Sequence, residues 1–247
     1  MQKRLAVFLT VCILNLSLSP IVIGESFFYP TAFERALIYF SVGRWDKVTD
    51  ELNNALRETP DDPELLTFIG GFLSALGDES QATTFLSRAE RNSPSIGVYV
   101  IQGDVYRRLK NIRKAEEYYN KALKQEPNTV MAYIGLGRLK EIDNKLEDAL
   151  ELYLRALEIN PQRIETLISS GKVEYSLERY EEAATHFAKA VELDSSVAEH
   201  HLWYAKSLYG SGLSDKALKQ LERTLELDST LSEAEILKAQ WLSEDIE

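Results

Sequence analysis

The chain has 247 residues, of which 45% are hydrophobic, and this is enough to build a sizeable core. Its formal net charge of −11 at pH 7 disfavours binding to nucleic acid or to anionic lipid, because both carry negative charge. The single cysteine, Cys12, lies in the N-terminal segment. The chain beyond that segment therefore has no disulfide, thiol nucleophile or thiolate metal site.

Residues 1–24 have the pattern of an export signal. Lys3 and Arg4 form a short positive segment ahead of an apolar stretch at residues 5–18. Val22 and Gly24 then offer small or moderate side chains at the −3 and −1 positions of a cut after residue 24. The pattern favours a cleaved secretory signal.

Two alternatives to a cleaved signal are open. Residues 5–23 are nearly long enough to cross a bilayer, which allows an uncleaved membrane anchor. A lipoprotein acylated at Cys12 is disfavoured, because Val11 is bulky for the preceding position and the apolar run continues past the cysteine. In each case the N-terminal cations favour an exported, extracytoplasmic placement of the remaining chain, either periplasmic or secreted, or else anchored to the membrane.

The rest of the chain is built from a repeated block. Three columns of small residues and one of prolines return in a shared register, with a step of about 34 residues. Independent columns do not share a register by chance. The first column is Val48, Ala82, Ala115, Ala149, Ala183 and Ala217, the second is Ala55, Ala89, Ala122, Ala156, Ala190 and Thr224, the third is Ala36, Gly70, Gly103, Gly137, Gly171 and Ala205, and the prolines are Pro60, Pro94, Pro127 and Pro161.

The period predicts six helix pairs, followed by one further helix. Asp62 and Pro63 have the pattern of an N-cap with proline at the first helical position, which marks a helix start. Ser232 and Glu235 resemble a capping box and predict a helix at about residues 233–242 that covers the last repeat, followed by an acidic tail to residue 247. The six repeats are expected at residues 29–62, 63–95, 96–129, 130–163, 164–197 and 198–231.

These blocks resemble the tetratricopeptide repeat, a helix–turn–helix unit of about 34 residues. The match covers roughly residues 29–231, and in the fourth block only Lys140 departs from the family pattern. The resemblance implies an all-α, right-handed superhelix and a protein-binding role, without fixing which partner is bound. The matching residues of the fourth block are Tyr133, Leu136, Gly137, Ala149, Tyr153, Ala156 and Pro161.

The sequence offers no pattern of catalytic, cofactor-binding or metal-binding residues. His200 and His201 are adjacent on a helix and point about 100° apart, so they cannot chelate one ion from one face. His186 lies on another helix with no matching carboxylate spacing. The many carboxylates early in second helices are expected to offset helix dipoles rather than to act as general acids or bases. A non-enzymatic protein without cofactor or metal is expected.

The resemblance implies a concave groove lined by positions 2, 5, 9 and 12 of each first helix. In repeats three to six these positions supply three cations, two tyrosines and a row of apolar residues. The pattern does not match the carboxylate clamp of chaperone-binding family members, which needs asparagine at position 9 and lysine at position 5. The expected groove residues are Val100, Asp104, Ile134, Arg138, Ile168, Lys172, Tyr175, Leu202, Lys206 and Tyr209.

Two interpretations of the groove cations remain open. In the first, the cations bind acidic side chains or a terminal carboxylate of an extended peptide, while the apolar row and the tyrosines hold its other side chains. In the second, some of the cations pair with Glu165 and Glu199, one or two helical turns away, and stay solvated.

Three functional hypotheses follow for the whole protein. The leading one is an exported scaffold that binds a protein partner in its groove. The alternative is a structural protein that self-assembles end to end or as a dimer, with an exposed Trp203 or Trp241 as the contact. The third, a regulatory subunit of an enzyme, is the weakest, because no residue pattern supports it.

Overall fold

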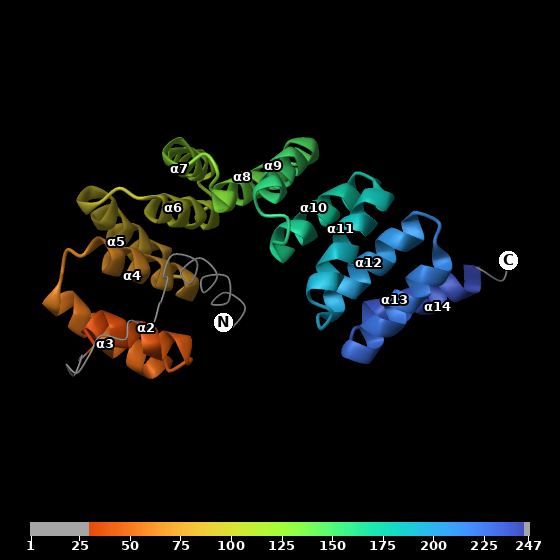
Figure 1. The fold of residues 1–247 in the computed structure, drawn as a ribbon, viewed down its shortest axis with the longest axis horizontal. Coiled ribbons are helices and arrows are strands. Elements are labelled where there is room, and N and C mark those ends of the chain that lie inside the picture. Colours follow the sequence, from red (N-terminus) through yellow and green to blue (C-terminus); the bar gives the residue numbers. More distant parts are fainter. Residues whose placement is uncertain (1–29, 245–247) are drawn as a thin grey trace, which may run out of the picture. The chain divides into compact units, whose positions relative to one another are not determined.

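This computed structural model describes residues 30–244, within which the chain forms thirteen α-helices and no β-strand (Figure 1). The expected signal or anchor at residues 1–24 lies outside the described residues. Twelve helices form six consecutive pairs, and the thirteenth follows them alone. The pairs are α2 (Ala32–Ser41) with α3 (Trp45–Glu58), α4 (Pro63–Leu76) with α5 (Glu79–Asn92), α6 (Ile96–Arg108) with α7 (Ile112–Gln125), α8 (Val130–Ile142) with α9 (Leu146–Ile159), α10 (Ile164–Ser176) with α11 (Tyr180–Leu193), and α12 (Ala198–Gly210) with α13 (Ser214–Leu227), followed by α14 (Ser232–Glu244).

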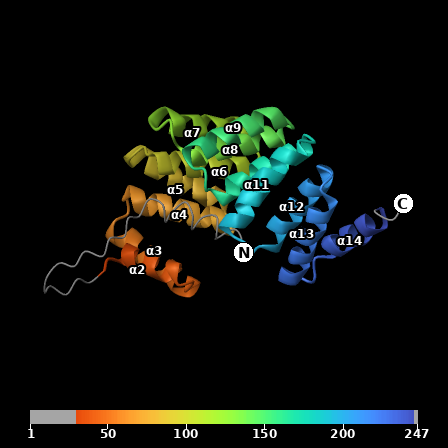
Figure 2. The same ribbon diagram turned by 45° about the vertical axis from the view of Figure 1, so that its right-hand side comes forward.

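The helices belong to two compact units, residues 1–127 and residues 128–247. Unit 1 contains α2 to α7 and unit 2 contains α8 to α14. Within unit 2, helices α11, α12, α13 and α14 follow one another side by side (Figure 2). The expected all-α fold, with six helix pairs and a terminal helix, is confirmed for the described residues.

The turn inside each pair has one residue in the left-handed region, always at position 15 of the repeat. Three of the six are glycines, which adopt this conformation without steric cost, and three are not. The left-handed residue ends the first helix and redirects the chain into the second. The six residues and their φ angles are Gly43 (73°), Gly77 (91°), Lys110 (58°), Asn144 (56°), Glu178 (60°) and Gly212 (79°).

The small-residue columns let the two helices of a pair approach closely. Ala149, Ala156 and the ring of Tyr153 are fully buried between α8 and α9. A Cβ atom built on Gly137 would lie 2.6 Å from Tyr153 Cε1, so no larger residue fits there without movement of the ring. The columns therefore mark the interior of each pair, as the sequence pattern indicates.

Helix starts confirm one capping prediction and correct another. The Asp62 side chain accepts a 2.8 Å hydrogen bond from the Leu65 amide, and Pro63 is the first residue of α4. Helix α14 begins at Ser232 itself, so this serine lies in the first turn and is not the N-cap of an expected capping box. The helix also extends beyond the predicted end, to Glu244.

Helix α14 covers the last repeat through one face. Ala234 is fully buried and Trp241 is 4% exposed, and both join the core formed by α12 and α13. The Trp241 ring stacks on Tyr209, with the ring centroids 4.1 Å apart and the planes 4° apart. Trp241 is thus a packing residue in this unit and not an exposed contact.

Across residues 30–244, every helix is too short or too polar to serve as a membrane span.

Candidate protein-binding surface of unit 2

Helices α8, α10, α12 and α14 are equivalent in register. Each has 13 residues, and each begins one repeat after the one before it. Their equivalent side chains therefore lie at the same place on successive helices. The three predicted groove cations occupy position 9, and each is paired with a glutamate at position 2 of the next first helix. The pairs are Arg138 with Glu165, Lys172 with Glu199, and Lys206 with Glu233.

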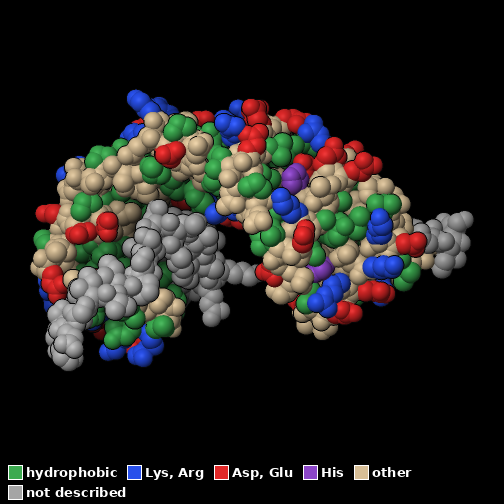
Figure 3. Space-filling model, viewed as in Figure 1, with side chains coloured by type: hydrophobic (Ala, Val, Ile, Leu, Met, Phe, Trp, Pro, Cys, Tyr) green, Lys and Arg blue, Asp and Glu red, His purple; other side chains and the backbone are tan. Residues whose placement is uncertain are grey.

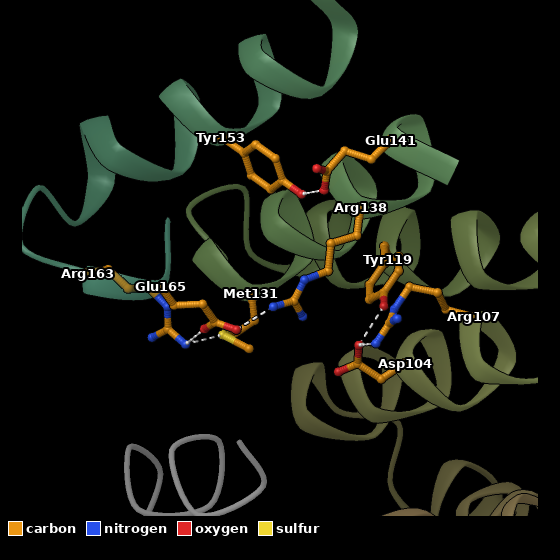
Figure 4. Close-up of polar contacts among 9 residues, drawn as sticks. All are labelled: Asp104, Arg107, Tyr119, Met131, Arg138, Glu141, Tyr153, Arg163 and Glu165. Atoms are coloured by element: carbon orange, nitrogen blue, oxygen red, sulfur yellow. Dashed lines mark hydrogen bonds and ion pairs between the residues drawn. The ribbon is translucent and has the colours of Figure 1, made fainter. Parts of the chain in front are cut away.

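The first pair extends into a network with a second arginine (Figure 4). Arg138 donates to one carboxylate oxygen of Glu165, and Arg163 Nη2 donates to the other at 2.9 Å. The same Arg163 nitrogen lies 2.9 Å from the sulfur of Met131. Two guanidinium groups, one from α8 and one from the residue that precedes α10, thus share one carboxylate.

The Glu165 carboxylate remains ionised within this network. Burial alone would raise its pKa, but the charges of Arg138 and Arg163 and their hydrogen bonds outweigh burial and lower the pKa below its usual value. Arg163 is the most enclosed member, since its side chain is 10% exposed. The network is therefore a partly desolvated patch in which electrostatic interactions are stronger than in open water.

The other two pairs are more exposed, and each is built on a single lysine. Lys172 Nζ lies 2.9 Å from Glu199 Oε1, and Lys206 Nζ lies 3.0 Å from Glu233 Oε1. The two glutamates are 57% and 53% exposed. On the face of unit 2 drawn in Figure 3, basic and acidic side chains lie next to one another. Glu165 and Glu199 do pair with groove cations, but their partners Arg138 and Lys172 lie on the first helix of the preceding repeat, whereas the second interpretation placed the partners one or two helical turns away.

Trp203 lies close to both lysines, and we refer to Lys172, Lys206, Trp203 and Tyr175 together as the lysine cluster. Its ring lies 4.9 Å from Lys172 Nζ and 4.1 Å from Lys206 Nζ, within range of cation–π attraction. Tyr175 meets it edge-on at 5.6 Å, and Phe187 stacks on it at 5.9 Å. The result is a half-buried surface of alternating cations and aromatic rings on α10 and α12.

The two predicted tyrosine anchors are held differently. Burial, and to a lesser extent the charge of Glu233, raises the pKa of Tyr175, so its hydroxyl stays protonated. Lys206 Nζ lies 5.6 Å from the Tyr175 ring. Tyr209 stacks on Trp241, which covers one side of its ring. Tyr175 is therefore part of the lysine cluster, whereas Tyr209 mainly attaches α14.

The expected apolar row at position 5 is corrected. Ile134 is fully buried, and Val100 and Leu202 are each 3% exposed, so all three are core residues. Ile168 is only partly buried, against a core cluster of α9, α10 and α11. On a helical wheel, position 5 lies about 60° from position 8, which faces the second helix of the pair, so that helix covers position 5.

Val100 and Asp104 belong to unit 1, whereas the other predicted groove residues belong to unit 2. Asp104 is engaged within its own repeat (Figure 4). It accepts a 2.8 Å hydrogen bond from the Tyr119 hydroxyl and pairs with Arg107 at 3.3 Å. Burial, followed by the charge of Asp104, raises the pKa of Tyr119 well above its usual value.

Sequence reasoning missed several members of the surface. Arg163 and Glu233 were outside the predicted set, and Trp203 was assigned to either packing or end contacts. The constant spacing from cation to glutamate, repeated three times, was a signal that could have found the pairs. Trp203 is the only tryptophan at position 6 of the six repeats, so comparison of equivalent positions gave no pattern that marked it as functional.

Other polar groups show no further site. His186 Nδ1 lies 2.6 Å from Glu174 Oε2, and His201 bonds to Gln220 and to the Ser195 carbonyl. Over the stretch from residue 30 to 244, no three or more His, Cys, Asp or Glu side chains are grouped so that they could hold a metal. A shallow hollow of unit 2 is lined by Asn144, Lys145, Leu146, Glu147, Asp148 and Leu177, none of them a predicted groove residue.

The sequence profile of the tetratricopeptide repeat family matches residues 102–164 and 169–232, which together make up more than half of the chain. The chain therefore belongs to the tetratricopeptide repeat family. Members of this family are protein–protein interaction scaffolds and in general are not enzymes. No curated protein sequence matches the chain significantly.

Solved structures with the same fold are distant in sequence. YrrB, described as a tetratricopeptide repeat protein with an unusual peptide-binding site, is 21% identical with a TM-score of 0.59; the match covers 76% of this chain and 97% of YrrB. PilF of Pseudomonas aeruginosa is 15% identical with a TM-score of 0.73, covering 85% and 96%. TTC0263 of Thermus thermophilus is 21% identical with a TM-score of 0.54, covering 73% and 99%. At these identities the likeness concerns the fold alone.

Proposed function

We propose that unit 2 binds an extended, acidic segment of a partner protein along the first helices α8, α10 and α12. The observation that carries this proposal is the row of position-9 cations, Arg138, Lys172 and Lys206, which recurs once per repeat on a protein of net charge −11. A row of cations with a fixed spacing can recognise carboxylates at several points along one chain. The fold adds support, because YrrB has a peptide-binding site on a similar scaffold.

The strongest point of attachment is the network around Glu165. Arg138 and Arg163 both direct guanidinium groups at this one carboxylate. A carboxylate of the partner, either a side chain or a chain terminus, would add a second acceptor beside Glu165. Arginine is well suited to this role, because its planar guanidinium offers several donors and can hold two carboxylates at once.

The lysine pairs serve as exchangeable contacts. Glu199 and Glu233 are more than half exposed, so each can rotate into solvent when an acidic side chain takes its lysine. Exposed pairs of this kind contribute about 0–1 kcal/mol, so little is lost on exchange. Trp203 and Tyr175 keep the lysines in place and offer ring surface to the apolar parts of the partner.

A crosslinking pulldown with the full-length protein from its native host tests this proposal. The triple variant Arg138→Ala, Lys172→Ala and Lys206→Ala is expected to lose the partner that the unchanged chain captures. The matched control is Glu199→Gln with Glu233→Gln, which frees the lysines and is expected to retain or strengthen capture. Affinity for the captured partner should also fall with added salt, because exposed charges are screened.

If the triple variant and the unchanged chain capture the partner equally well, the three cations do not contribute to binding. Helicity measured by circular dichroism controls for folding, because a variant that loses helicity tests stability instead. Loss of capture by the glutamine control would mean that the pairs are needed for structure.

We also propose that the repeats act outside the cytoplasm. The support is the pattern of residues 1–24, with two cations followed by an apolar stretch. Fractionation of the native host, with sequencing of the mature N-terminus, tests this. A cleaved signal predicts a new N-terminus near Glu25 in the soluble exported fraction, and an anchor predicts an intact N-terminus in the membrane fraction. Recovery from the cytoplasm would overturn the proposal.

A further inference from the structure

Helix α14 has the length and register of a first helix but lacks a second helix within the described residues. It begins one repeat after α12 and has the same 13 residues. Glu233 pairs with Lys206 as Glu199 pairs with Lys172. Ala234 and Trp241 on its inner face are buried against α12 and α13. The helix is thus held as the first half of a seventh repeat.

The outer face of α14 is the face that a second helix covers elsewhere in unit 2. Positions 4, 5, 8, 11 and 12 of a first helix lie within about 120° of arc. In α14 these positions are Glu235, Ile236, Ala239, Leu242 and Ser243, and all of them are exposed. Ile236 is 65% exposed and Leu242 is 46% exposed.

The complete repeats show which side chains cover this face. Position 5 is buried at Ile134 and Leu202. At position 8, a Cβ atom on Gly171 would lie 2.8 Å from the Phe187 ring. The covering helix presents a small residue, a bulky residue four positions later and a small residue three positions after that. In α11 these are Ala183, Phe187 and Ala190, all fully buried.

The charge expected of the covering helix follows from position 4, which meets positions 23 and 26 of the second helix. In unit 1, the ring of Tyr99 (position 4) lies 6.3 Å from Tyr118 (position 23) and 5.7 Å from Lys121 Nζ (position 26). Position 26 is a cation in five of the six second helices: Arg88, Lys121, Arg155, Lys189 and Arg223.

We propose that the outer face of α14 binds a positively charged amphipathic helix of a partner protein, which packs where a second helix packs in the complete repeats. Glu235 at position 4 pairs with a cation at position 26 of that helix, while Ile236, Ala239 and Leu242 take its small and bulky apolar residues. The net charge of −11 attracts such a helix and opposes approach of a second copy of the chain. This surface is separate from the cation row. The proposal for α14 and the proposal for the cation row can therefore be tested independently.

A peptide with the sequence of α7, residues 112–125 with blocked ends, is a suitable probe. It has the required pattern at Ala115, Tyr119, Lys121 and Ala122, and its four basic residues exceed its two acidic ones. Titration of the fluorescently labelled peptide with the full-length protein, followed by anisotropy, is expected to show saturable binding. Ile236→Glu combined with Ala239→Glu should weaken this binding at least tenfold. Ile142→Glu, at a residue that is 57% exposed on α8, is the matched control and should have no effect.

Charge exchange provides the sharper test. Glu235→Lys should weaken binding of the α7 peptide several-fold, and a peptide carrying Lys121→Glu should restore the affinity of that variant. Absence of binding, or binding that is indifferent to the α14 substitutions, would overturn the proposal. Sedimentation of the protein alone is the remaining check, because a dimer that Ile236→Glu dissociates would assign this face to a second copy.

Discussion

At the scale of single residues, the turn inside each of the six repeats requires one residue with a left-handed backbone conformation, and this residue is glycine in three repeats and another residue in three. Glycine meets the left-handed conformation at position 15 without cost, whereas Lys110, Asn144 and Glu178 adopt it with a side chain. For a residue with a Cβ atom this conformation costs about 1–2 kcal/mol, with asparagine the least affected. The three non-glycine turns are therefore places where the fold tolerates local strain.

Glu178→Gly is expected to stabilise unit 2 by about 1 kcal/mol, because it removes that strain. Gly212→Ala is the reverse experiment, since a Cβ atom there would meet nothing within 4 Å and only the backbone conformation is at issue. It should cost a similar amount. Urea denaturation measures both changes, and Glu178→Gln controls for the lost charge. A neutral Glu178→Gly would show that the turn relaxes around the side chain.

At the scale of helices, positions 8 and 24 are matched in size within each pair. Where position 24 is aromatic, position 8 is glycine; where it is leucine, position 8 is alanine in two of three repeats. The two residues fill one space between the helices, so a change in either affects the other. The pairs are Ala36 with Leu52, Gly70 with Leu86, Gly103 with Tyr119, Gly137 with Tyr153, Gly171 with Phe187, and Ala205 with Leu221.

Gly171→Ala is expected to destabilise the protein by about 1–2 kcal/mol, because the new methyl group would overlap the Phe187 ring. Phe187→Leu alone should cost about 1 kcal/mol through the space it leaves. In the double variant, which reproduces the Ala–Leu combination of repeat six, the cost of the alanine should disappear. A double-mutant cycle by urea denaturation measures this coupling. Additive effects would mean that the two residues do not share one space.

The helix pairs could be predicted from the sequence because several columns repeat in one register, and a shared register constrains every helix at once. The groove was less predictable. Position 5 lies about 60° from position 8 on the helical wheel, and Ile134 at this position is fully buried. How far the second helix covers the first on either side of position 8 depends on the packing of the pair, which residue spacing alone does not give. To predict the pairing of Lys206 with Glu233, α14 would have had to be aligned with the first helices of the repeats. It was treated only as a capping helix.

At the scale of the whole molecule, the response to acid follows from carboxylates whose pKa is lowered by folding. Such a group adds stability above the pKa of the unfolded chain and loses it as the pH falls through the lower folded value. His200 acts with the same sign at higher pH, because burial lowers its pKa. The carboxylates with lowered pKa are Asp46, Glu51, Glu165, Asp194 and Asp228.

Stability is therefore expected to decline slightly below pH about 6.5 and more steeply below pH about 4.5. Urea midpoints measured between pH 7 and pH 3 would show this profile. Glu165→Gln keeps the shape of the side chain but removes the titrating group, so it should reduce the acid-dependent loss by on the order of 1 kcal/mol. A variant whose profile stays parallel to that of the unchanged protein below pH 4.5 would assign the loss to the other carboxylates.

The ion pairs of unit 2 have a genetic consequence. Each joins a cation at position 9 to a glutamate at position 2 of the next repeat, and the pairs succeed one another at the interval of the repeat itself. Position 2 of repeat four is Met131, so a duplicated one-repeat block from α8 to α12 must include Glu165 or Glu199; it would then copy the cation, the glutamate and the left-handed turn together. The lengthened chain would acquire a correctly placed new pair at the junction without any further mutation. A single recombination event can therefore lengthen or shorten this surface by a whole repeat.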